Sequence, residues 1–375
     1  MEGIGPSQTE RAPMMGLKKL DWYIIKKFLT TFFISILFLS VIVIIFDVSE
    51  KIDDFVRREA PLHEIVFDYY LNWIPYFMNM YAPMFVFLTV IFFTSKMTGD
   101  SEVIAILSSG ISFHRLVVPY IISSVVIAML SLGLSLWVIP HANGTRVDFE
   151  QKYIPRTRVK IGHDLHYKLE DDHYVYLESF SAYNNTAYNF TLEDLSDGHL
   201  RSKITAESAQ YDTLTGKWKL RNWFIRDYGE GMTDHIRSGR QMDTVLSLTR
   251  EDFFRNKFTI QRLNEDELEA LIATQKARGD ASVKHALIEK NQRLSLPISA
   301  IILTIIGVSL STKKRRGGMG LNLAAGTALG FSYILFMQFS EMFVATDTLP
   351  ASIAIWLPNI LYAIIAAVLY IKAPK

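Results

Sequence analysis

The fold of this chain is decided first by the stretch FLTTFFISILFLSVIVIIF, which runs from Phe28 to Phe46 without a charged residue. As an α-helix, such a run can cross the hydrocarbon core of a bilayer, which is about 30 Å thick and needs roughly 20 residues. Lysines between Lys18 and Lys27 precede it, and no small-residue cleavage signal follows it. It is therefore a retained membrane span rather than a signal peptide.

Further apolar runs follow in an arrangement of three spans, a long polar insert and three more spans. After the first span they are Ile65–Phe93, Leu116–Ile139, Ser295–Leu310, Leu321–Val344 and Ala351–Ile371. Half of all residues are hydrophobic, which agrees with this pattern. We therefore expect an α-helical integral membrane protein with six transmembrane helices in a 3 + 3 arrangement.

The charges of the short loops predict the orientation. Lys and Arg gather before the first span, between spans two and three, between spans four and five, and at the C-terminal end. The loop from Asp47 to Glu64, on the opposite face, is mainly acidic. Because short loops rich in Lys and Arg stay in the cytoplasm, we expect both termini inside and the insert, about residues 140–290, outside.

The insert changes to a period of two from about His166 to Leu248, which is typical of half-buried strands. Charged and apolar residues alternate from Lys217 to Trp223. We therefore expect an antiparallel β-domain, as a sandwich, a jelly roll or an open sheet. A helical period returns from Asn264. The domains expected are a disordered tail at 1–16, spans one to three at 17–140 with a cytoplasmic helix at about 100–110, the β-domain at 141–262, a helical connector at 263–292, and spans four to six at 293–375.

Composition narrows the chemistry. The chain has no cysteine, which excludes disulfides and thiolate metal sites. Its net charge of +1 gives no argument for binding nucleic acid. His163, His166 and His173 match no strong ligand spacing, and no nucleophile–base arrangement stands out, so we expect neither a metal site nor an enzyme. The glycines at Gly317–Gly320 lack the Lys-Ser/Thr of a phosphate-binding loop.

The loop after span two predicts a short helix with an apolar face. Val103, Ile106 and Leu107 share one side of a helix that begins near Glu102, and Gly110 is placed to end it. Such a helix suits docking into a groove on a soluble partner. The alternative is an interfacial helix that only packs on the inner leaflet.

A family resemblance follows from motifs in this order. They are Leu20-Asp21-Trp22-Tyr23-Ile24-Ile25-Lys26-Lys27-Phe28, Ser101-Glu102-Val103-Ile104-Ala105 with Ser109-Gly110-Ile111-Ser112, Arg293-Leu294-Ser295-Leu296-Pro297, Ile306-Gly307-Val308-Ser309-Leu310, and Trp356-Leu357-Pro358-Asn359. Placed around a β-insert, they resemble the lipopolysaccharide export permeases of the LptF/LptG family over about residues 17–372.

The resemblance implies a subunit of an ATP-binding-cassette exporter in the bacterial inner membrane, with a periplasmic antiparallel domain like a β jelly roll. Its expected partners are a cytoplasmic ATPase dimer, a second LptF/LptG-type permease, a periplasmic β-jelly-roll bridge protein and lipopolysaccharide. ATP and magnesium would bind the partner ATPase, and this chain would carry no cofactor. The competing hypotheses are a non-transporting scaffold for envelope assembly and a membrane enzyme acting on lipid.

The resemblance also implies site residues. The motif makes Glu102 the acidic contact with the ATPase, supported by Val103, Ile106 and Leu107. Lys51, Arg57 and Arg58 are candidates for contact with the phosphates of the glycolipid, and the alternative for these residues is ordinary surface pairing with Asp53, Asp54 or Glu59.

Candidate groove residues in the β-domain are apolar or aromatic. They are Tyr174, Tyr176, Trp218, Leu220 and Phe224. The alternative is that they form the ordinary core of a β-sandwich, which needs the same residue types.

Overall fold

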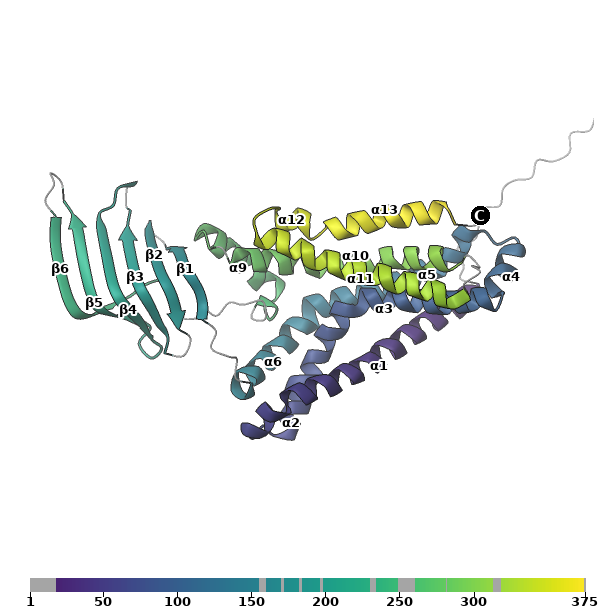
Figure 1. The fold of residues 1–375 in the computed structure, drawn as a ribbon, viewed down its shortest axis with the longest axis horizontal. Helices are drawn as coiled ribbons and strands as arrows, with labels where there is room; N and C mark the ends of the chain where they lie inside the picture. Colours follow the sequence, from purple (N-terminus) through teal and green to yellow (C-terminus); the bar gives the residue numbers. More distant parts are fainter. Residues whose placement is uncertain are drawn as a thin grey trace, which may run out of the picture.

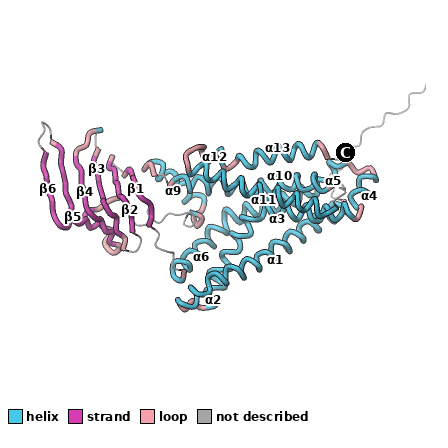
Figure 2. The backbone as a smooth tube through the Cα atoms, viewed as in Figure 1, coloured by secondary structure: helices cyan, strands magenta, loops and turns pink. Residues whose placement is uncertain are grey.

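The computed structural model describes residues 18–154, 160–169, 172–181, 184–195, 198–229, 234–248, 260–280, 282–312 and 318–373. The tail expected at residues 1–16 lies outside these ranges. The described chain is elongated, with a helical bundle at one end and a β-sheet at the other (Figure 1). Figure 2 shows the same division, with helices in cyan and strands in magenta.

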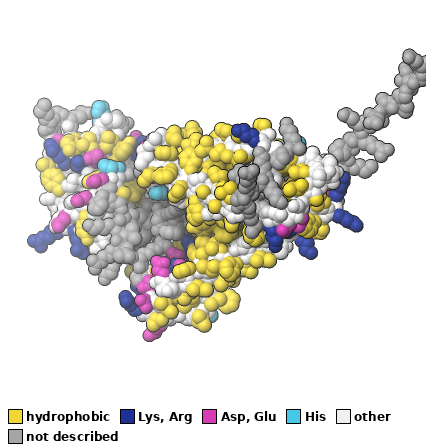
Figure 3. Space-filling view, turned by 45° about the vertical axis from the view of Figure 1, so that its right-hand side comes forward, with side chains coloured by type: hydrophobic (Ala, Val, Ile, Leu, Met, Phe, Trp, Pro, Cys, Tyr) yellow, Lys and Arg dark blue, Asp and Glu magenta, His cyan; other side chains and the backbone are white. Residues whose placement is uncertain are grey.

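The described residues include six helical segments long and apolar enough to cross a membrane. These are Lys19–Arg57, Leu62–Gly99, Phe113–Tyr153, Val283–Ser311, Gly320–Ala345 and Ala351–Ile371. Three precede the sheet and three follow it, which confirms the expected 3 + 3 arrangement. Apolar side chains cover much of the helical part of the surface in Figure 3, whereas charged side chains are frequent on the sheet.

The helices have the following bounds: α1 Lys19–Arg57, α2 Leu62–Glu64, α3 Leu71–Gly99, α4 Glu102–Ser108, α5 Phe113–Gly133, α6 Ile139–Tyr153, α9 Glu265–Ala277, α10 Val283–Ser311, α11 Gly318–Ala345, α12 Ala351–Ala354 and α13 Leu357–Ile371. Two π-helical segments, η1 at Ile65–Tyr70 and η2 at Leu134–Val138, continue into neighbouring helices. Asn72 donates to the carbonyls of Phe67 and Asp68, at 2.7 and 3.0 Å, and so satisfies backbone groups of η1.

Two helices extend beyond the apolar runs. The segment after Phe46 is helical as far as Arg57, although the sequence predicts a loop from Asp47. Likewise α6 continues span three to Tyr153, so the β-domain begins with a strand at Lys160 and not at residue 141. The reason is tertiary packing, because Phe55, Phe149 and Tyr153 bury one face of each extension in a shared aromatic cluster.

The centre of the bundle is α10, the most buried of the six spans, whereas α1 is the most exposed. Close contacts with α3 depend on glycine. A Cβ at Gly307 would lie 2.9 Å from Val90, and one at Gly326 would lie 2.1 Å from Ile91. Gly326 and Gly330 of α11 therefore face α3 within the same chain.

The β-domain is one antiparallel sheet in which each strand pairs with its neighbours in sequence. Its strands are β1 Lys160–Lys168, β2 His173–Ser181, β3 Thr186–Asp194, β4 Ser202–Asp212, β5 Lys217–Tyr228 and β6 Asp234–Thr244. This confirms the expected antiparallel insert, and the sheet formed by these strands is not closed. Strand β1 lies nearest the helices and β6 farthest from them (Figure 1).

A helical connector joins the sheet to the bundle. The amide of Lys168 in β1 donates to the carbonyl of Arg278, just after α9, at 2.9 Å. At the other end of the connector, buried Arg293 of α10 contacts Glu265 of α9 at 3.3 Å and donates to the carbonyl of Leu263 at 2.8 Å. The sheet is therefore held to span four through α9.

Candidate functional site

A single line of residues bends the sheet. The strand registers align one residue from each strand across the sheet: Asp164, Glu178, Asn189, Glu207, Asn222 and Arg240. We call this line the bend row. On the odd-numbered strands its members have left-handed backbones, with φ of 56° at Asp164 and 49° at both Asn189 and Asn222. Asp and Asn tolerate this conformation better than other non-glycine residues.

The bend row carries exposed polar side chains that pair across strands. Tyr176 donates its hydroxyl to Asp164 at 2.8 Å, and Asn222 donates to Glu207 at 2.5 Å. Asn189 donates to Glu178 in the same way. All six members are exposed, so the row lies on the outer side of the bend.

The inner face of the sheet is apolar. On each of strands β2 to β4, buried side chains stand three residues apart on either side of the bend row rather than two: Leu177 and Phe180, Ala187 and Phe190, and Ala206 and Ala209. These residues form one hydrophobic cluster around Trp218. The inner face is thus one continuous apolar surface on both sides of the bend row, and we call this surface the trough.

Part of this trough is filled by the chain itself. The Trp218 indole N–H donates to the carbonyl of Leu248 at 2.9 Å, so the segment that follows β6 crosses the inner face. Other inner-face side chains are only half-buried: Leu165, Ile204, Trp223 and Met242. These four leave apolar surface at the trough that Leu248 does not cover.

The five candidate groove residues do not share one face. Trp218 and Leu220 are fully buried on the inner face. Tyr174, Tyr176 and Phe224 lie on the outer face, because their neighbours Val175, Leu177 and Trp223 belong to the inner cluster. A single groove lined by all five is therefore excluded.

The bend row explains why the pattern misleads on β5. Strict alternation places Leu220 and Phe224 on the same face of the strand. The left-handed residue Asn222 lies between them and shifts the alternation by one position. As a result Trp223 faces inward and Phe224 outward. Asn and Asp within otherwise regular strands were the sequence signal for this shift.

Trp223 is the main inner-face residue that the pattern does not select. It stands directly over Gly239 of β6, where an added Cβ would approach the indole ring to 2.7 Å. This cross-strand contact requires glycine, since any side chain would displace the ring. Gly239 is therefore a second signal for an aromatic ring on the facing strand.

The short helix expected after span two exists as α4, at the end of the bundle away from the sheet (Figure 1). Glu102 begins it and is partly exposed, and Tyr23 donates its hydroxyl to this carboxylate at 3.3 Å. The Lys27 ammonium lies 4.0 Å from the same carboxylate. The preceding residue, Ser101, has a left-handed backbone with φ of 63°.

The apolar face of α4 points into its own protein. Val103 is completely buried, and Ile106 and Leu107 are half-buried against the same core. The exposed apolar side chains of α4 are Ile104 and Ala105, which the periodicity did not select. The buried Val103 side chain thus holds α4 against the helical bundle, because an amphipathic helix packs its apolar face on an adjacent hydrophobic core.

A partly buried ion pair joins α1 to α5 near the start of α1. The Arg115 guanidinium of α5 donates two hydrogen bonds to the Asp21 carboxylate of α1, at 2.7 and 2.5 Å. Asp21 is 2 % exposed. The opening motif Leu20-Asp21-Trp22-Tyr23 thus joins the start of α1 to α5 and contributes Tyr23 to Glu102.

The phosphate candidates divide into one partly buried and two exposed residues. The Lys51 ammonium lies 2.5 Å from the Asp47 carboxylate, contacts the Tyr69 hydroxyl and lies 4.9 Å from the centre of the Tyr69 ring. It is therefore held by its own helix and by η1. Arg57 and Arg58 are exposed at the end of α1, where Arg58 donates to the carbonyl of Lys152 at 3.4 Å.

Of the polar residues of span five, Glu341 is partly buried and Gln338 is exposed. Glu341 accepts a hydrogen bond from Gln292 of α10 at 2.6 Å, and both Glu341 and Gln338 line a cavity between α3, α10 and α11. Among the described residues, no group of three or more His, Asp or Glu side chains is placed to hold a metal ion.

The chain matches a known family over nearly its whole length. The sequence model of the family described as lipopolysaccharide export system permease LptF/LptG covers residues 22–372. No curated protein matched the chain.

Proposed function

Because the chain belongs to the LptF/LptG family of lipopolysaccharide export permeases, we propose that it is the transmembrane subunit of an exporter that removes lipopolysaccharide, or a related glycolipid, from the inner membrane. The energy would come from a separate ATPase of the ATP-binding-cassette type. The extracted lipid would pass through the β-domain to a periplasmic bridge that leads towards the outer membrane.

One observation carries this proposal: an apolar trough built on a sheet that stands outside the membrane-spanning helices. Each methylene of an acyl chain holds a lipid in the bilayer by about 0.8 kcal/mol. A lipid with several acyl chains therefore leaves the membrane only if another apolar surface receives it. Leu165, Ile204, Trp223 and Met242 offer such surface.

The energy source must act at the opposite end of the molecule. The sequence contains no GxxxxGK[ST] phosphate-binding loop, so ATP and magnesium would bind the partner. In this proposal α4 docks on a cytoplasmic ATPase dimer through Glu102, Ile104 and Ala105, while Val103, Ile106 and Leu107 fix the helix to the bundle. The loops rich in Lys and Arg support a cytoplasmic location for this end.

The exposed face of α1 and the outer edge of β6 would accommodate the remaining partners. A second permease of the same family would complete a cavity for the lipid beside the exposed apolar face of α1. The outer edge of β6 pairs with none of the described strands, which suits addition of a strand from a periplasmic β-jelly-roll protein. Arg57 and Arg58, at the outer end of α1, would meet the lipid phosphates as it leaves the bilayer, with Lys51 behind them.

The experiment is a pull-down of the tagged chain in mild detergent, followed by mass spectrometry of proteins and lipids. We expect an ATP-binding-cassette ATPase, a second permease and a phosphorylated glycolipid. The matched control is the Glu102→Arg variant, which should retain the lipid and the second permease but lose the ATPase. A chain that purifies without ATPase or glycolipid would contradict the proposal and favour a scaffold for envelope assembly.

A further inference from the structure

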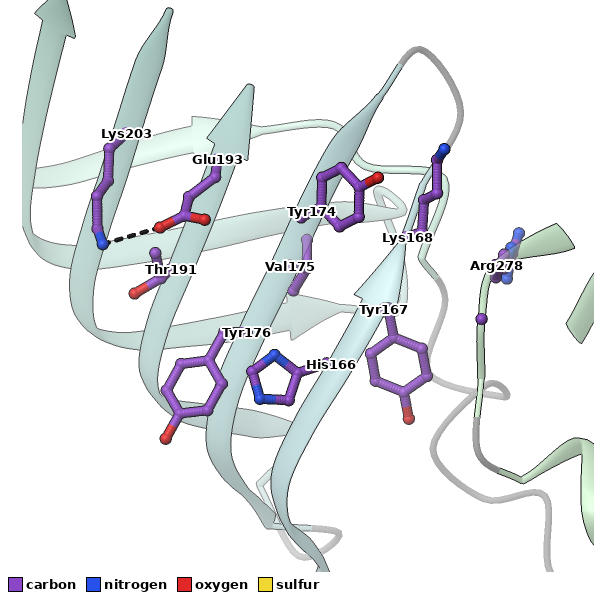
Figure 4. Close-up of a pocket in the computed structure, with 11 residues that line it drawn as sticks. His166, Tyr167, Lys168, Tyr174, Val175, Tyr176, Thr191, Glu193, Lys203 and Arg278 are labelled. Atoms are coloured by element: carbon purple, nitrogen blue, oxygen red, sulfur yellow. Dashed lines mark ion pairs between the residues drawn. The ribbon is translucent and has the colours of Figure 1, made fainter. Parts of the chain in front are cut away.

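A second hollow lies on the outer face of the β-domain, apart from the apolar trough. It has a volume of about 590 Å³ and is lined by strands β1 to β4 and by the turn at Arg278–Gly279 after α9. Figure 4 shows the side chains of His166, Tyr174 and Tyr176 around this hollow. Because β1 is the strand nearest the helices, the hollow lies at the membrane-proximal end of the domain (Figure 1).

Aromatic rings form one part of this hollow. The rings of His166 and Tyr176 lie 4.8 Å apart, and the Tyr176 hydroxyl is fixed by its hydrogen bond to Asp164. Tyr174, two residues before Tyr176 on β2, is 38 % exposed. Aromatic side chains that are held in place but remain accessible bind flat apolar surfaces at little entropic cost. The C–H face of a sugar ring is such a surface.

Charged and hydroxyl groups form the other part. Lys168, Lys203 and Arg278 line the hollow together with the Glu193 carboxylate. Lys168 lies 2.8 Å from the Asp172 carboxylate, and Arg278 donates to the carbonyl of Ser247 at 3.3 Å. Lys203 lies 2.8 Å from Glu193, as the dashed line in Figure 4 marks. The three cations outnumber the two carboxylates that pair with them, Asp172 and Glu193. The lining also contains the Thr191 hydroxyl, which with the Glu193 carboxylate can accept from sugar hydroxyls.

We propose that this outer hollow binds a phosphorylated saccharide. The rings of Tyr174, Tyr176 and His166 would stack on the sugar, while the Lys203 ammonium would contact the phosphate in place of the Glu193 carboxylate. The inference rests on the proposed function, because it assigns the phosphorylated sugars of an exported glycolipid to a surface separate from the trough for its acyl chains. The two surfaces lie on opposite faces of the same sheet.

An acyl chain is the wrong ligand for the hollow. Its lining residues include three cations and a carboxylate, and removing these from water without a polar partner would cost more than an acyl chain returns. The inner face, by contrast, is lined by a continuous apolar cluster. The two faces thus suit the two halves of one amphipathic molecule.

The test uses the full-length chain in detergent and saturation-transfer NMR with glucose 6-phosphate as the probe. Glucose and inorganic phosphate are measured beside it. The variants are Tyr174→Ala, Tyr176→Ala and Lys203→Ala. Tyr188→Ala is the control for the tyrosines, since Tyr188 is 41 % exposed on the same sheet but does not line the hollow. Lys219→Ala is the control for Lys203, because Lys219 is likewise paired with a carboxylate, at 2.7 Å from Asp212.

We expect glucose 6-phosphate to bind more tightly than glucose or phosphate, and each variant of the hollow to weaken it by about tenfold. Both control variants should bind as the natural chain does. Tyr176→Phe keeps the ring and should retain most of the binding, which guards against a simple folding defect. Binding unchanged in the three variants, no binding of the sugar phosphate, or equal binding of inorganic phosphate would each overturn the inference. If ATPase and glycolipid still co-purify in that case, the proposed function stands without it.

Discussion

At the scale of single residues, the left-handed backbone of Asn222 decides which side chains face the trough. Replacing Asn222 by Gly should leave the domain stable, whereas Asn222→Val should destabilise it by about 1–2 kcal/mol, because a β-branched residue is strained at φ of 49°. Thermal unfolding and protease sensitivity of the full chain in detergent measure the difference. Arg221→Val, at the exposed neighbouring position without positive φ, is the matched control and should change little. Equal stability of the Gly and Val variants would contradict this role.

Asp212 is a pH-dependent contact at the hairpin between β4 and β5. The Lys219 ammonium, 2.7 Å away, and the amides of Leu214 and Thr215 lower the pKa of its carboxyl to about 2. A lowered pKa in the folded state means that its contribution to stability is complete above the ordinary value near 3.8 and is lost as the pH falls towards 2. Amide exchange of the hairpin, corrected for intrinsic rates, should therefore become faster over that window. The Asp212→Asn variant should lack the change, and an identical pH profile in both proteins would argue against the contact.

The limits of the sequence are clearest at this scale. The alternation from Lys217 to Trp223 predicts a strand correctly, because every second side chain is apolar there. It cannot show that Asn222 adopts a left-handed backbone, since Asn is also common in turns and on exposed strand surfaces. Strict alternation therefore places Phe224 in the candidate groove and leaves Trp223 out of it.

At the scale of elements, the periodicity of α4 predicts an apolar face but does not predict what that face contacts. The periodicity of Val103, Ile106 and Leu107 correctly predicts a helix with one apolar face. Whether that face meets a partner or the protein's own core depends on what lies beneath it. Here it meets the bundle, so the proposed contact with a partner would use Glu102, Ile104 and Ala105.

The consequence can be tested with charge substitutions on the two faces of α4. Glu102→Arg should reduce co-purification of the ATPase by at least about tenfold, because it reverses the charge at the docking surface. Ile104→Asp should have the same effect without loss of folded protein, since Ile104 is 43 % exposed. Val103→Asp should instead lower the yield of folded protein, because it buries a charge in the core. ATPase co-purification and the yield of monodisperse protein separate these outcomes, and normal ATPase binding by Ile104→Asp would exclude this face as the docking surface.

The sequence pattern also does not predict where the long helices α1 and α6 end. Apolar runs predict where helices cross the membrane, but α1 and α6 continue beyond those runs because Phe55, Phe149 and Tyr153 pack together. The residues between Asp47 and Arg57 are mostly charged, and their helical state comes from that contact rather than from hydropathy. Arg57 and Arg58 are consequently held at the end of α1.

At the scale of the whole molecule, the division into spans and a sheet was predictable because apolar runs and alternation are independent signals. Asn and Asp within the strands mark candidate positions, but the bend row itself exists only when all six strands pair in this register. That row turns one sheet into a trough with an apolar inside and a polar outside. The proposed path of the lipid therefore depends on a feature of the assembled sheet and not on any single strand.

The face assignment leads to a direct test of the path. A photo-crosslinking phenylalanine analogue placed at Trp223 should capture glycolipid through an acyl chain during ATP-driven export, because Trp223 lies on the half-buried inner face. The same analogue at Phe224 is the matched control, since this neighbouring aromatic residue faces outward and is 41 % exposed. Mass spectrometry of the crosslinked peptides identifies the attachment point on the lipid. Attachment through an acyl chain at Phe224 and not at Trp223 would show that the lipid crosses the opposite face. Attachment at Trp223 that depends on ATP hydrolysis would show that ATPase docking at α4 and lipid binding in the trough belong to one transport cycle.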